Sequence, residues 1–319
     1  NTTLLGNPNC GAIRFLDTVC AGAYIQIVAL QADTAQEDEI TQRVRVITDS
    51  TSDLDRETAI SLGIEIVPIY VRWGDETYVD GVSLTPAQFY RRLPVSNGHP
   101  LTAQPGPEVL ASVYTRVPEC EGVVSIHISS RISGTYNSAM LARSMVADSV
   151  PVEVIDSRLN SGGLTLVVME AARAARSGAS MPEVAAAARQ AIEQVRMMAL
   201  FDTMKYLARG GRISPAIAVA AGFLRVKPVL TFRDGIIIRA GLVRSRAEGQ
   251  ARLLRFLAGM SPVVEVAVSH STYPEELDPF VERVIALVGD TPVHVFEMGA
   301  ALGVHGGPGM IVVAGRRRV

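Results

Sequence analysis

The stretch Ile128-Ser-Ser-Arg-Ile-Ser-Gly-Thr-Tyr-Asn-Ser138 stands where an apolar run, 122–128, passes into a helical pattern. It is rich in hydroxyl side chains, and Arg131 is its only charged residue. A strand that leads into a helix brings free main-chain N–H groups together, and such groups suit a carboxylate or a phosphate. The stretch therefore predicts an anion site that uses hydroxyls and amides instead of a lysine.

Two other apolar runs end in similar loops, Thr48–Ser52 and Asp156–Ser161. Strand patterns near 44–48, 64–71, 122–128 and 152–155 alternate with helical patterns, which predicts a parallel sheet covered on both faces. We expect the helix before Leu62 to be capped by Ser52 or Asp53. Ligands of such sheets bind beyond the carboxyl ends of the strands, so the three loops should share one site.

The second half has a different pattern. Alanine-rich helices are expected at 161–178 and 182–198, and a hairpin at 226–241 turns at Arg233-Asp234-Gly235. Further strands and helices to 314 predict a mixed sheet. The fold class is therefore α/β with two domains, an N-terminal three-layer parallel-sheet domain at 44–160 and a C-terminal mixed-sheet domain at 161–319. Residues 1–43 are an extension of uncertain order, and the true start of the chain is open.

Composition excludes several classes of protein. The net charge is −2, from 30 basic and 32 acidic residues, which argues against a nucleic-acid binder. Cys10, Cys20 and Cys120 are odd in number and lack metal-site spacing, so a reduced, cytoplasmic setting is expected. The ten-residue apolar run 21–30 is too short for a membrane span, and a signal peptide is the weaker alternative.

Candidate site residues fall mainly in the loops. Asp49 and Asp156 close two predicted strands, where they would orient amides or hydroxyls. His305 stands in a glycine-rich loop, Gly303–Gly309, and could donate a hydrogen bond to a carboxylate. His127 falls in a predicted strand and is expected to be packed. No metal-ligand cluster and no nucleotide-binding glycine motif occurs, so no metal, no cofactor and no catalytic residue is predicted.

The ordered set of motifs resembles the DegV family, the fatty-acid-binding subunits of bacterial fatty-acid kinases. The resemblance spans residues 44 to about 315. It rests on Thr48–Leu54, Leu101–Pro105, Ser129–Ala139, Asp156-Ser157, Lys205–Ser214, Leu224–Leu230 and His305–Gly309. Ala103 departs from the family's Thr-Ser-Gln-Pro pattern and removes a possible hydroxyl contact.

The resemblance implies a long-chain fatty acid bound in a tunnel, with its carboxylate at the polar end. A separate ATP-binding kinase subunit would phosphorylate the bound acid to an acyl phosphate used in phospholipid synthesis. The ligand-binding residues implied in this way are Thr102, Ser129, Ser130, His305 and, near the entrance, Arg212. The supporting residues are Asp49, Ser50, Ser133, Gly134, Thr135, Asp156 and Gly307.

Chain length, saturation and oligomeric state cannot be predicted from these motifs. The apolar segment 213–224 is a candidate for the tunnel wall, and Lys205, Arg209 and Arg212 form a basic patch that is either solvated surface or a docking site.

Two other functions stay open. One is a sugar- or amino-acid-binding module with a polar pocket throughout. The other is a serine hydrolase with Ser130 or Ser133 as nucleophile and His305 as base, although the sequence lacks a G-x-S-x-G elbow.

Overall fold

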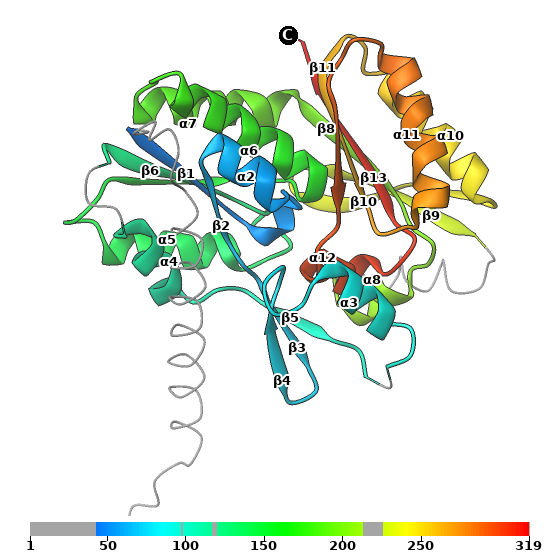
Figure 1. Ribbon diagram of the computed structural model, residues 1–319, viewed down its shortest axis with the longest axis horizontal. Coiled ribbons are helices and arrows are strands. Elements are labelled where there is room, and N and C mark those ends of the chain that lie inside the picture. Colours follow the sequence, from blue (N-terminus) through cyan, green and yellow to red (C-terminus); the bar gives the residue numbers. More distant parts are fainter. Residues whose placement is uncertain (1–42, 97, 117–119, 213–225, 319) are drawn as a thin grey trace, which may run out of the picture. The chain divides into compact units, whose positions relative to one another are not determined.

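The computed structural model describes residues 43–96, 98–116, 120–212 and 226–318 (Figure 1). Their strands form three sheets. The predicted extension 1–43, apart from Arg43, and the predicted tunnel segment 213–224 lie outside the described residues. The predicted division into two domains at residue 160 stays a prediction.

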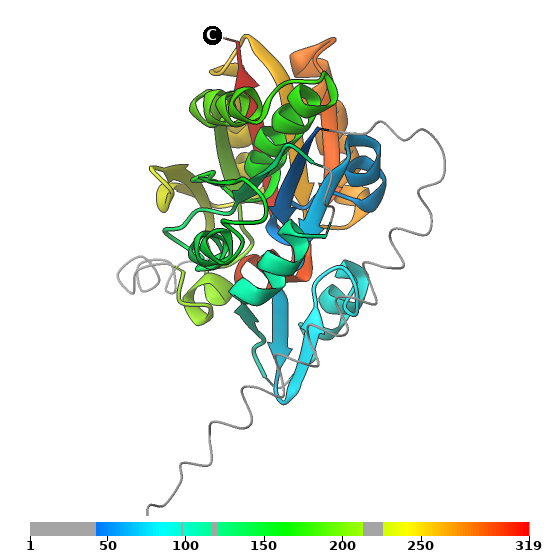
Figure 2. The same cartoon turned by 90° about the vertical axis from the view of Figure 1, so that its left-hand side faces the viewer.

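The first sheet has four parallel strands in the order β2-β1-β6-β7. Its strands are β1 (Val44–Asp49), β2 (Ile64–Val67), β6 (Gly122–His127) and β7 (Val152–Asp156). All six residues of β6 are buried, as expected for a central parallel strand covered on both faces. Its helices are α2 (Arg56–Leu62), α4 (Pro107–Tyr114), α5 (Thr135–Met145), α6 (Ser161–Arg176) and α7 (Met181–Gln194). Helices α6 and α7 lie on one face and α4 and α5 on the other, which gives three layers (Figures 1 and 2).

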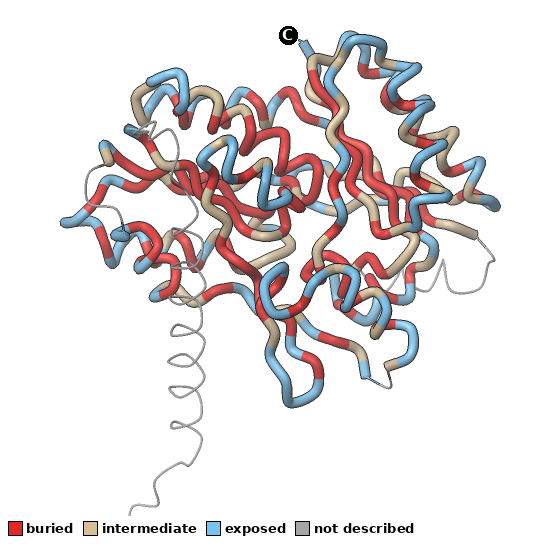
Figure 3. Tube along the Cα trace, viewed as in Figure 1, coloured by how far each residue is buried: buried red, intermediate tan, exposed pale blue. Residues whose placement is uncertain are grey.

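The second sheet has six strands in the order β10-β9-β8-β13-β11-β12. Only the β11–β12 pair is parallel, so the sheet is mixed, as predicted. Its strands are β8 (Val195–Leu200), β9 (Lys227–Arg233), β10 (Ile236–Val243), β11 (Val263–His270), β12 (Val293–Glu297) and β13 (Ile311–Arg317). Helices α10 (Arg246–Ala258) and α11 (Pro274–Val288) cover one face, and α6 packs on the other. Figure 3 shows the buried residues concentrated in the sheets.

A third sheet, β4-β3-β5, is antiparallel and carries Thr102 in its short strand β5 (Leu101–Ala103). Its other strands are β3 (Tyr70–Trp73) and β4 (Glu76–Val79). Three short helices and one 3₁₀ turn lie near it: α3 (Pro86–Arg92), α8 (Lys205–Arg209), α12 (Ala300–Gly306) and η1 (Ser50–Ser52).

Three local predictions were wrong. The helix expected at 182–198 ends at Gln194, because β8 pairs with β13 on one side and β9 on the other, and this pairing overrides the helical pattern. Asp55 caps α2, since Ser52 lies in η1 and Asp53 adopts a left-handed conformation with φ of 57°. His305 lies in the last turn of α12, not in a glycine loop.

One buried carboxylate ties α6 to the second sheet. Glu265 has a side chain 3% exposed, and Arg173 Nη1 of α6 donates to it at 2.9 Å. His294 Nε2 lies 2.8 Å from the carboxylate, and Arg316 Nη2 lies 3.5 Å away. Burial alone would raise the pKa of Glu265, but the hydrogen bonds and charges of His294 and Arg173 outweigh it and lower the pKa to about 2.

We expect Glu265→Gln to lower the free energy of unfolding by about 3 kcal/mol at pH 7, because a shift of one pKa unit corresponds to about 1.4 kcal/mol. The folded pKa lies below the unfolded value of 4.5, so this contribution is present above pH 4.5 and is lost as the pH falls toward 2. Urea unfolding at pH 7, 4 and 3 measures the difference. Glu170→Gln, whose side chain is 31% exposed, is the matched control and should cost less. If the loss of unfolding free energy caused by Glu265→Gln did not become smaller at lower pH, the stabilisation by Glu265 would not be ionic.

Candidate functional site

A cavity lies between the six-stranded sheet and the loops that follow the first sheet. The space free of protein atoms measures about 860 Å³, part of it open to solvent, which is within the range of small-molecule sites. Strands β8, β9, β10 and β13 form one wall, which is apolar apart from Thr231, and apolar residues such as Ile69, Ile132 and Leu207 line other parts of the cavity. Representative apolar lining residues are Met197, Met198, Leu230, Phe232, Ile237 and Val312.

The polar lining comes from different elements, mainly η1, β5, the loop before α5, and α12. Its main members are Thr51, Thr102, Gln104, Ser133, Arg212 and His305. Asn160 and Thr231 add two further polar groups. The cavity is therefore amphipathic, with a wall of sheet strands that is apolar apart from Thr231 and, on the other elements, hydroxyl, amide, imidazole and guanidinium groups among further apolar residues.

Thr102 and His305 meet across the cavity wall although 203 residues separate them. Thr102 Oγ1 lies 3.0 Å from His305 Nε2, and the tautomer decides which of the two donates. His305 Nδ1 is buried and has no hydrogen-bond partner within the described part of the chain. Gly210 lies against this ring so closely that a Cβ at position 210 would overlap it, which explains the glycine.

The environment of His305 disfavours its charged form. Burial, followed by the positive charges of Arg212 and His99, lowers its pKa to about 3. The ring is therefore neutral in the physiological range and acts as one donor and one acceptor. Such a ring orients a neighbouring hydroxyl without forming an ion pair with an anion.

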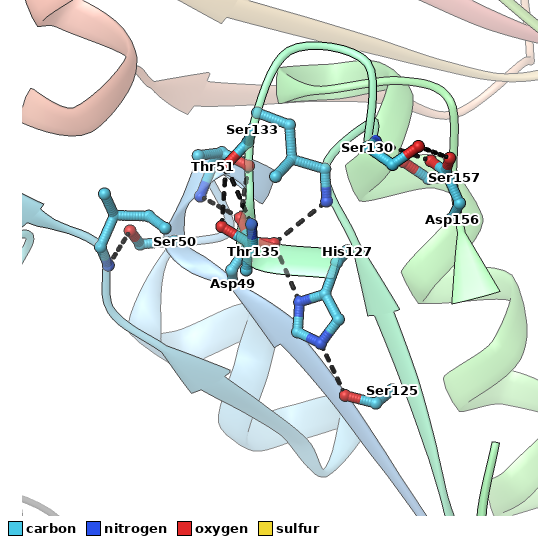
Figure 4. Close-up of polar contacts among 12 residues, drawn as sticks. Asp49, Ser50, Thr51, Ser125, His127, Ser130, Ser133, Thr135, Asp156 and Ser157 are labelled. Carbon is cyan, nitrogen blue, oxygen red and sulfur yellow. Dashed lines mark hydrogen bonds and ion pairs between the residues drawn. The ribbon is translucent and has the colours of Figure 1, made fainter. Parts of the chain in front are cut away.

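Asp49 is a buried support for η1 (Figure 4). Its Oδ1 accepts hydrogen bonds from the main-chain N–H and the hydroxyl of Thr51. Its Oδ2 accepts a hydrogen bond from the N–H of Ile128 and lies near His127 Nδ1, both at 3.0 Å. Asp49 itself does not line the cavity. It holds in place Thr51, which does.

His127 continues this network into the core. Its Nε2 lies 2.7 Å from Ser125 Oγ, which accepts a hydrogen bond from the hydroxyl of Tyr114 at 2.9 Å. Ser125, His127 and Asp49 thus have the order of a hydrolase triad. All three are 0% exposed, and none lines the cavity, so the group acts as a fixed polar link between β1 and β6. His127 is packed, as predicted.

Two of the predicted ligand-binding serines bind other parts of the protein. The Ser130 hydroxyl and N–H donate to Asp156, which also accepts the N–H of Arg158 (Figure 4). The Ser129 hydroxyl donates to the carbonyl of Gly235 at 2.8 Å, and so fastens the β9–β10 turn to the loop. Neither serine is among the residues that line the cavity.

Ser133, predicted as a supporting residue, lines the cavity. Its hydroxyl lies 2.9 Å from Thr135 Oγ1 and accepts the N–H of Thr135 at 3.3 Å. Gly134 lies against Gln104, since a Cβ at position 134 would lie 2.8 Å from the Gln104 amide nitrogen. The stretch 128–138 thus contributes the Ser133 hydroxyl to the cavity, and its Gly134 leaves room for the Gln104 amide.

The other predicted residues lie around this polar side. Arg212 lines the cavity and donates to the carbonyl of Gly210 at 2.7 Å. The Ser50 hydroxyl donates to Asp80 at 2.7 Å. Gly307, with φ of 73°, ends α12, and its carbonyl accepts from Ser271 at 2.8 Å.

Sequence reasoning did not single out Thr51, Gln104 and Asn160. All three stand in the quoted motifs or predicted strand-exit loops, but spacing along the chain cannot say which side chain of a loop faces inward. Among the described residues, no group of three His, Cys, Asp or Glu side chains could hold a metal ion. No helix in the described ranges is both long and apolar enough to cross a membrane.

Comparison with known proteins identifies the family. The profile described as "Uncharacterised protein, DegV family" matches residues 43–316. A DegV domain-containing protein of Streptomyces coelicolor is 33% identical over 284 residues, 86% of this chain and 98% of its own. Protein DegV of Bacillus subtilis is 31% identical over 84% of this chain and 97% of its own. The chain therefore belongs to the DegV family.

Solved structures of family members have the same fold. A Thermus thermophilus DegV family protein, described for its fatty acid binding, has a TM-score of 0.78 and 30% identity over 86% of this chain and 100% of its own. DegV of Bacillus subtilis, described as a fatty acid binding protein, has a TM-score of 0.79 and 29% identity, with coverages of 86% and 99%. A stearic-acid-binding protein of Eubacterium ventriosum has a TM-score of 0.79 and 27% identity, with coverages of 86% and 98%.

We expect His305 to stay neutral from pH 5 to pH 8, because burial and nearby positive charges lower its pKa to about 3. Two-dimensional NMR of the ¹⁵N-labelled imidazole rings should show His305 as a neutral imidazole, with nitrogen shifts far from those of an imidazolium, across this range. His305→Gln assigns the signal. A conversion to imidazolium nitrogen shifts with a midpoint near 6.5 would mean that the ring is not desolvated.

Proposed function

We propose that this protein binds a long-chain fatty acid in the amphipathic cavity and presents its carboxylate to a separate ATP-dependent kinase subunit. The observation that carries the proposal is the uneven placement of polar groups: the sheet strands line the cavity with apolar residues apart from Thr231, and the other polar lining groups all lie on the opposite elements. A sugar or amino acid would need polar partners throughout, and the strands of the six-stranded sheet supply mostly apolar ones. Fatty acid binding by solved relatives supports the same ligand class.

Burial of the tail supplies the affinity in this proposal. A sixteen-carbon acid has about fifteen groups to bury, and at roughly 0.8 kcal/mol each this amounts to about 12 kcal/mol. Association and ordering cost about 4–15 kcal/mol. The polar groups then need only to orient the carboxylate, which hydroxyls and a neutral imidazole do.

Thr102 and Ser133 are the proposed carboxylate contacts, and His305 orients the Thr102 hydroxyl. A carboxylate accepts hydrogen bonds only, so each contact must offer a proton. In the tautomer that meets this need, His305 Nε2–H donates to Thr102 Oγ1, and the Thr102 hydroxyl proton is free for the ligand. Hydroxyl donors leave the carboxylate more nucleophilic than a bidentate arginine pair would.

The proposed partner phosphorylates the bound acid. A carboxylate oxygen attacks the γ-phosphorus of ATP, the bond to the β,γ-bridging oxygen breaks, and acyl phosphate and ADP result. The nucleophile is the ligand, so this protein's share is to position the carboxylate and to exclude water from the tail. Support for a kinase partner is the family resemblance in the motifs. Arg212 is exposed and lines the cavity, and its proposed role is to supply positive charge to the transferred phosphoryl group.

The ligand assignment is tested by native mass spectrometry of protein made in bacteria. We expect one acyl chain per protein molecule, released on denaturation and identified as a C14–C18 acid. The delipidated protein should bind added palmitate at a ratio of one to one. Recovery without an acyl ligand, together with no palmitate binding, would exclude the proposed function.

We expect Thr102→Val and Ser133→Ala to alter the carboxyl ¹³C shift of bound [1-¹³C]palmitate and to weaken its binding only about fivefold each, because a hydrogen bond contributes about 1 kcal/mol. Ser130→Ala is the matched control. Its hydroxyl donates to Asp156, so the carboxyl signal should stay in place. An equal change with Ser130→Ala would assign the contact to Ser130, as the family resemblance implies.

A further inference from the structure

Two buried carboxylates hold the start of α12. Asp53 Oδ1 accepts the N–H of Gly299 at 3.1 Å, and Asp80 Oδ1 accepts the N–H of Ala300 at 2.8 Å. Asp53 is 6% exposed and Asp80 is 3% exposed. The first N–H groups of a helix lack partners within it and carry the positive end of the helix dipole, so ionised carboxylates bind them more strongly than neutral acids do.

The second oxygen of each carboxylate binds a hydroxyl from a different part of the chain. Ser161, the first residue of α6, donates to Asp53 Oδ2 at 2.6 Å. Ser50 of η1 donates to Asp80 Oδ2 at 2.7 Å. The start of α12 is thereby bound to the first turn of α6, to η1 and, through Asp80, to the end of β4.

Helix α12 connects these contacts at its start with the cavity. It has seven residues, and Ala301, Leu302 and His305 line the cavity. His305 is five positions beyond Ala300, roughly 7.5 Å along the helix axis. A helix this short moves as one piece, so a change at Gly299 and Ala300 shifts the His305 ring relative to Thr102.

We propose that Asp53 and Asp80 are positioning residues for His305, and that the ionised pair holds α12 in the arrangement that retains the ligand. Protonation of the pair weakens the two main-chain contacts and loosens His305 from Thr102. The inference rests on the proposed function for its ligand, but the movement of His305 is a property of the protein alone.

The pair is placed to change its charge near neutral pH. Burial raises the pKa of Asp53 to about 7 and that of Asp80 to about 6, and the hydroxyl and main-chain hydrogen bonds only partly offset this. Neighbouring negative charges raise both pKa values further. The charge of Asp80 raises the pKa of Asp53, and the charge of Asp49 raises the pKa of Asp80. Two groups this close titrate as a pair in two coupled steps.

Three further side chains, Tyr90, Ser269 and His305, lie on elements near the pair and differ in how they respond to pH. Tyr90 of α3 senses the charges of Asp53, Asp80 and Glu297, and burial, followed by these charges, raises its pKa, so it stays a neutral phenol. Ser269 of β11 faces Asp53 with a hydroxyl and carries no charge. His305 has a pKa of about 3 and does not titrate in the same window.

The test compares the pH dependence of ligand release in matched variants. The probe is 1-hexadecanol, which has no titratable group, and palmitate is run beside it. Release into phospholipid vesicles is timed from pH 5 to pH 8. For the wild type we expect release to be about tenfold faster at pH 5 than at pH 8, the factor expected when ionised helix-end contacts are lost. The variant Asp53→Asn/Asp80→Asn should release fast at every pH.

Two further variants distinguish protonation of the carboxylate pair from a simple loss of its structural contacts. Ser50→Ala removes a hydrogen bond that lowers the pKa of Asp80, so the midpoint of the release profile should move to higher pH. Asp55→Asn removes a carboxylate that caps α2, away from α12, and should leave the profile unchanged. A wild-type profile equal to that of the double asparagine variant would overturn the inference.

A second readout needs no ligand. The imidazole ¹⁵N signals of His305 should shift with the midpoint of the carboxylate pair in the wild type and not in the double variant. Failure of the wild type to bind hexadecanol or palmitate at any pH would count against the proposed function only. His305 signals that ignore both pH and the asparagine substitutions would count against the positioning role only.

Discussion

The close packing of α6 between the two large sheets is the constraint on which the site depends. A Cβ at Gly162 would lie 3.1 Å from the Cβ of Ala267, and one at Gly163 would lie 2.8 Å from Met197 Sδ. Glycine at these positions therefore lets the first turn of α6 approach the six-stranded sheet without displacing Ala267 or Met197. On its other side the same turn binds η1, through Ser161 to Asp53 and through Thr165 to the carbonyl of Ser52.

This packing brings the hydroxyl-rich loops of the first sheet against the apolar face of the second. Met197 touches Gly163 and also lines the cavity, so the wall and the helix contact are one feature. The polar groups behind the lining form hydrogen bonds with each other. The pairs are Asp49 with His127, Ser130 with Asp156, and Ser129 with the carbonyl of Gly235. These bonds fix the loops, and a few hydroxyls, two amides, an imidazole and the Arg212 guanidinium remain to face the cavity.

The parallel sheet and its loops were predictable because the signal is local. Apolar runs of strand length each end in a hydroxyl-rich loop, and parallel strands bring such ends to one edge of a sheet. The strand β8 was not predictable in this way, because Val195–Leu200 continues an alanine-rich helix and becomes a strand only through pairing with β9 and β13. His305 was placed in a loop for a related reason. The nearby glycines serve packing, since a Cβ at Gly303 would meet Phe89 and Tyr90.

The sequence by itself determined the family, the α/β class and the loops that carry the polar groups, because those properties follow from short motifs and from local periodicity. Only the tertiary structure decided which side chain of each loop faces the cavity. Thr51 and Ser133 line it, whereas Ser130 binds Asp156, and Asp53 and Asp80 meet at the start of a helix more than 200 residues further along the chain. Such choices depend on packing between distant segments, and no spacing within one segment encodes them.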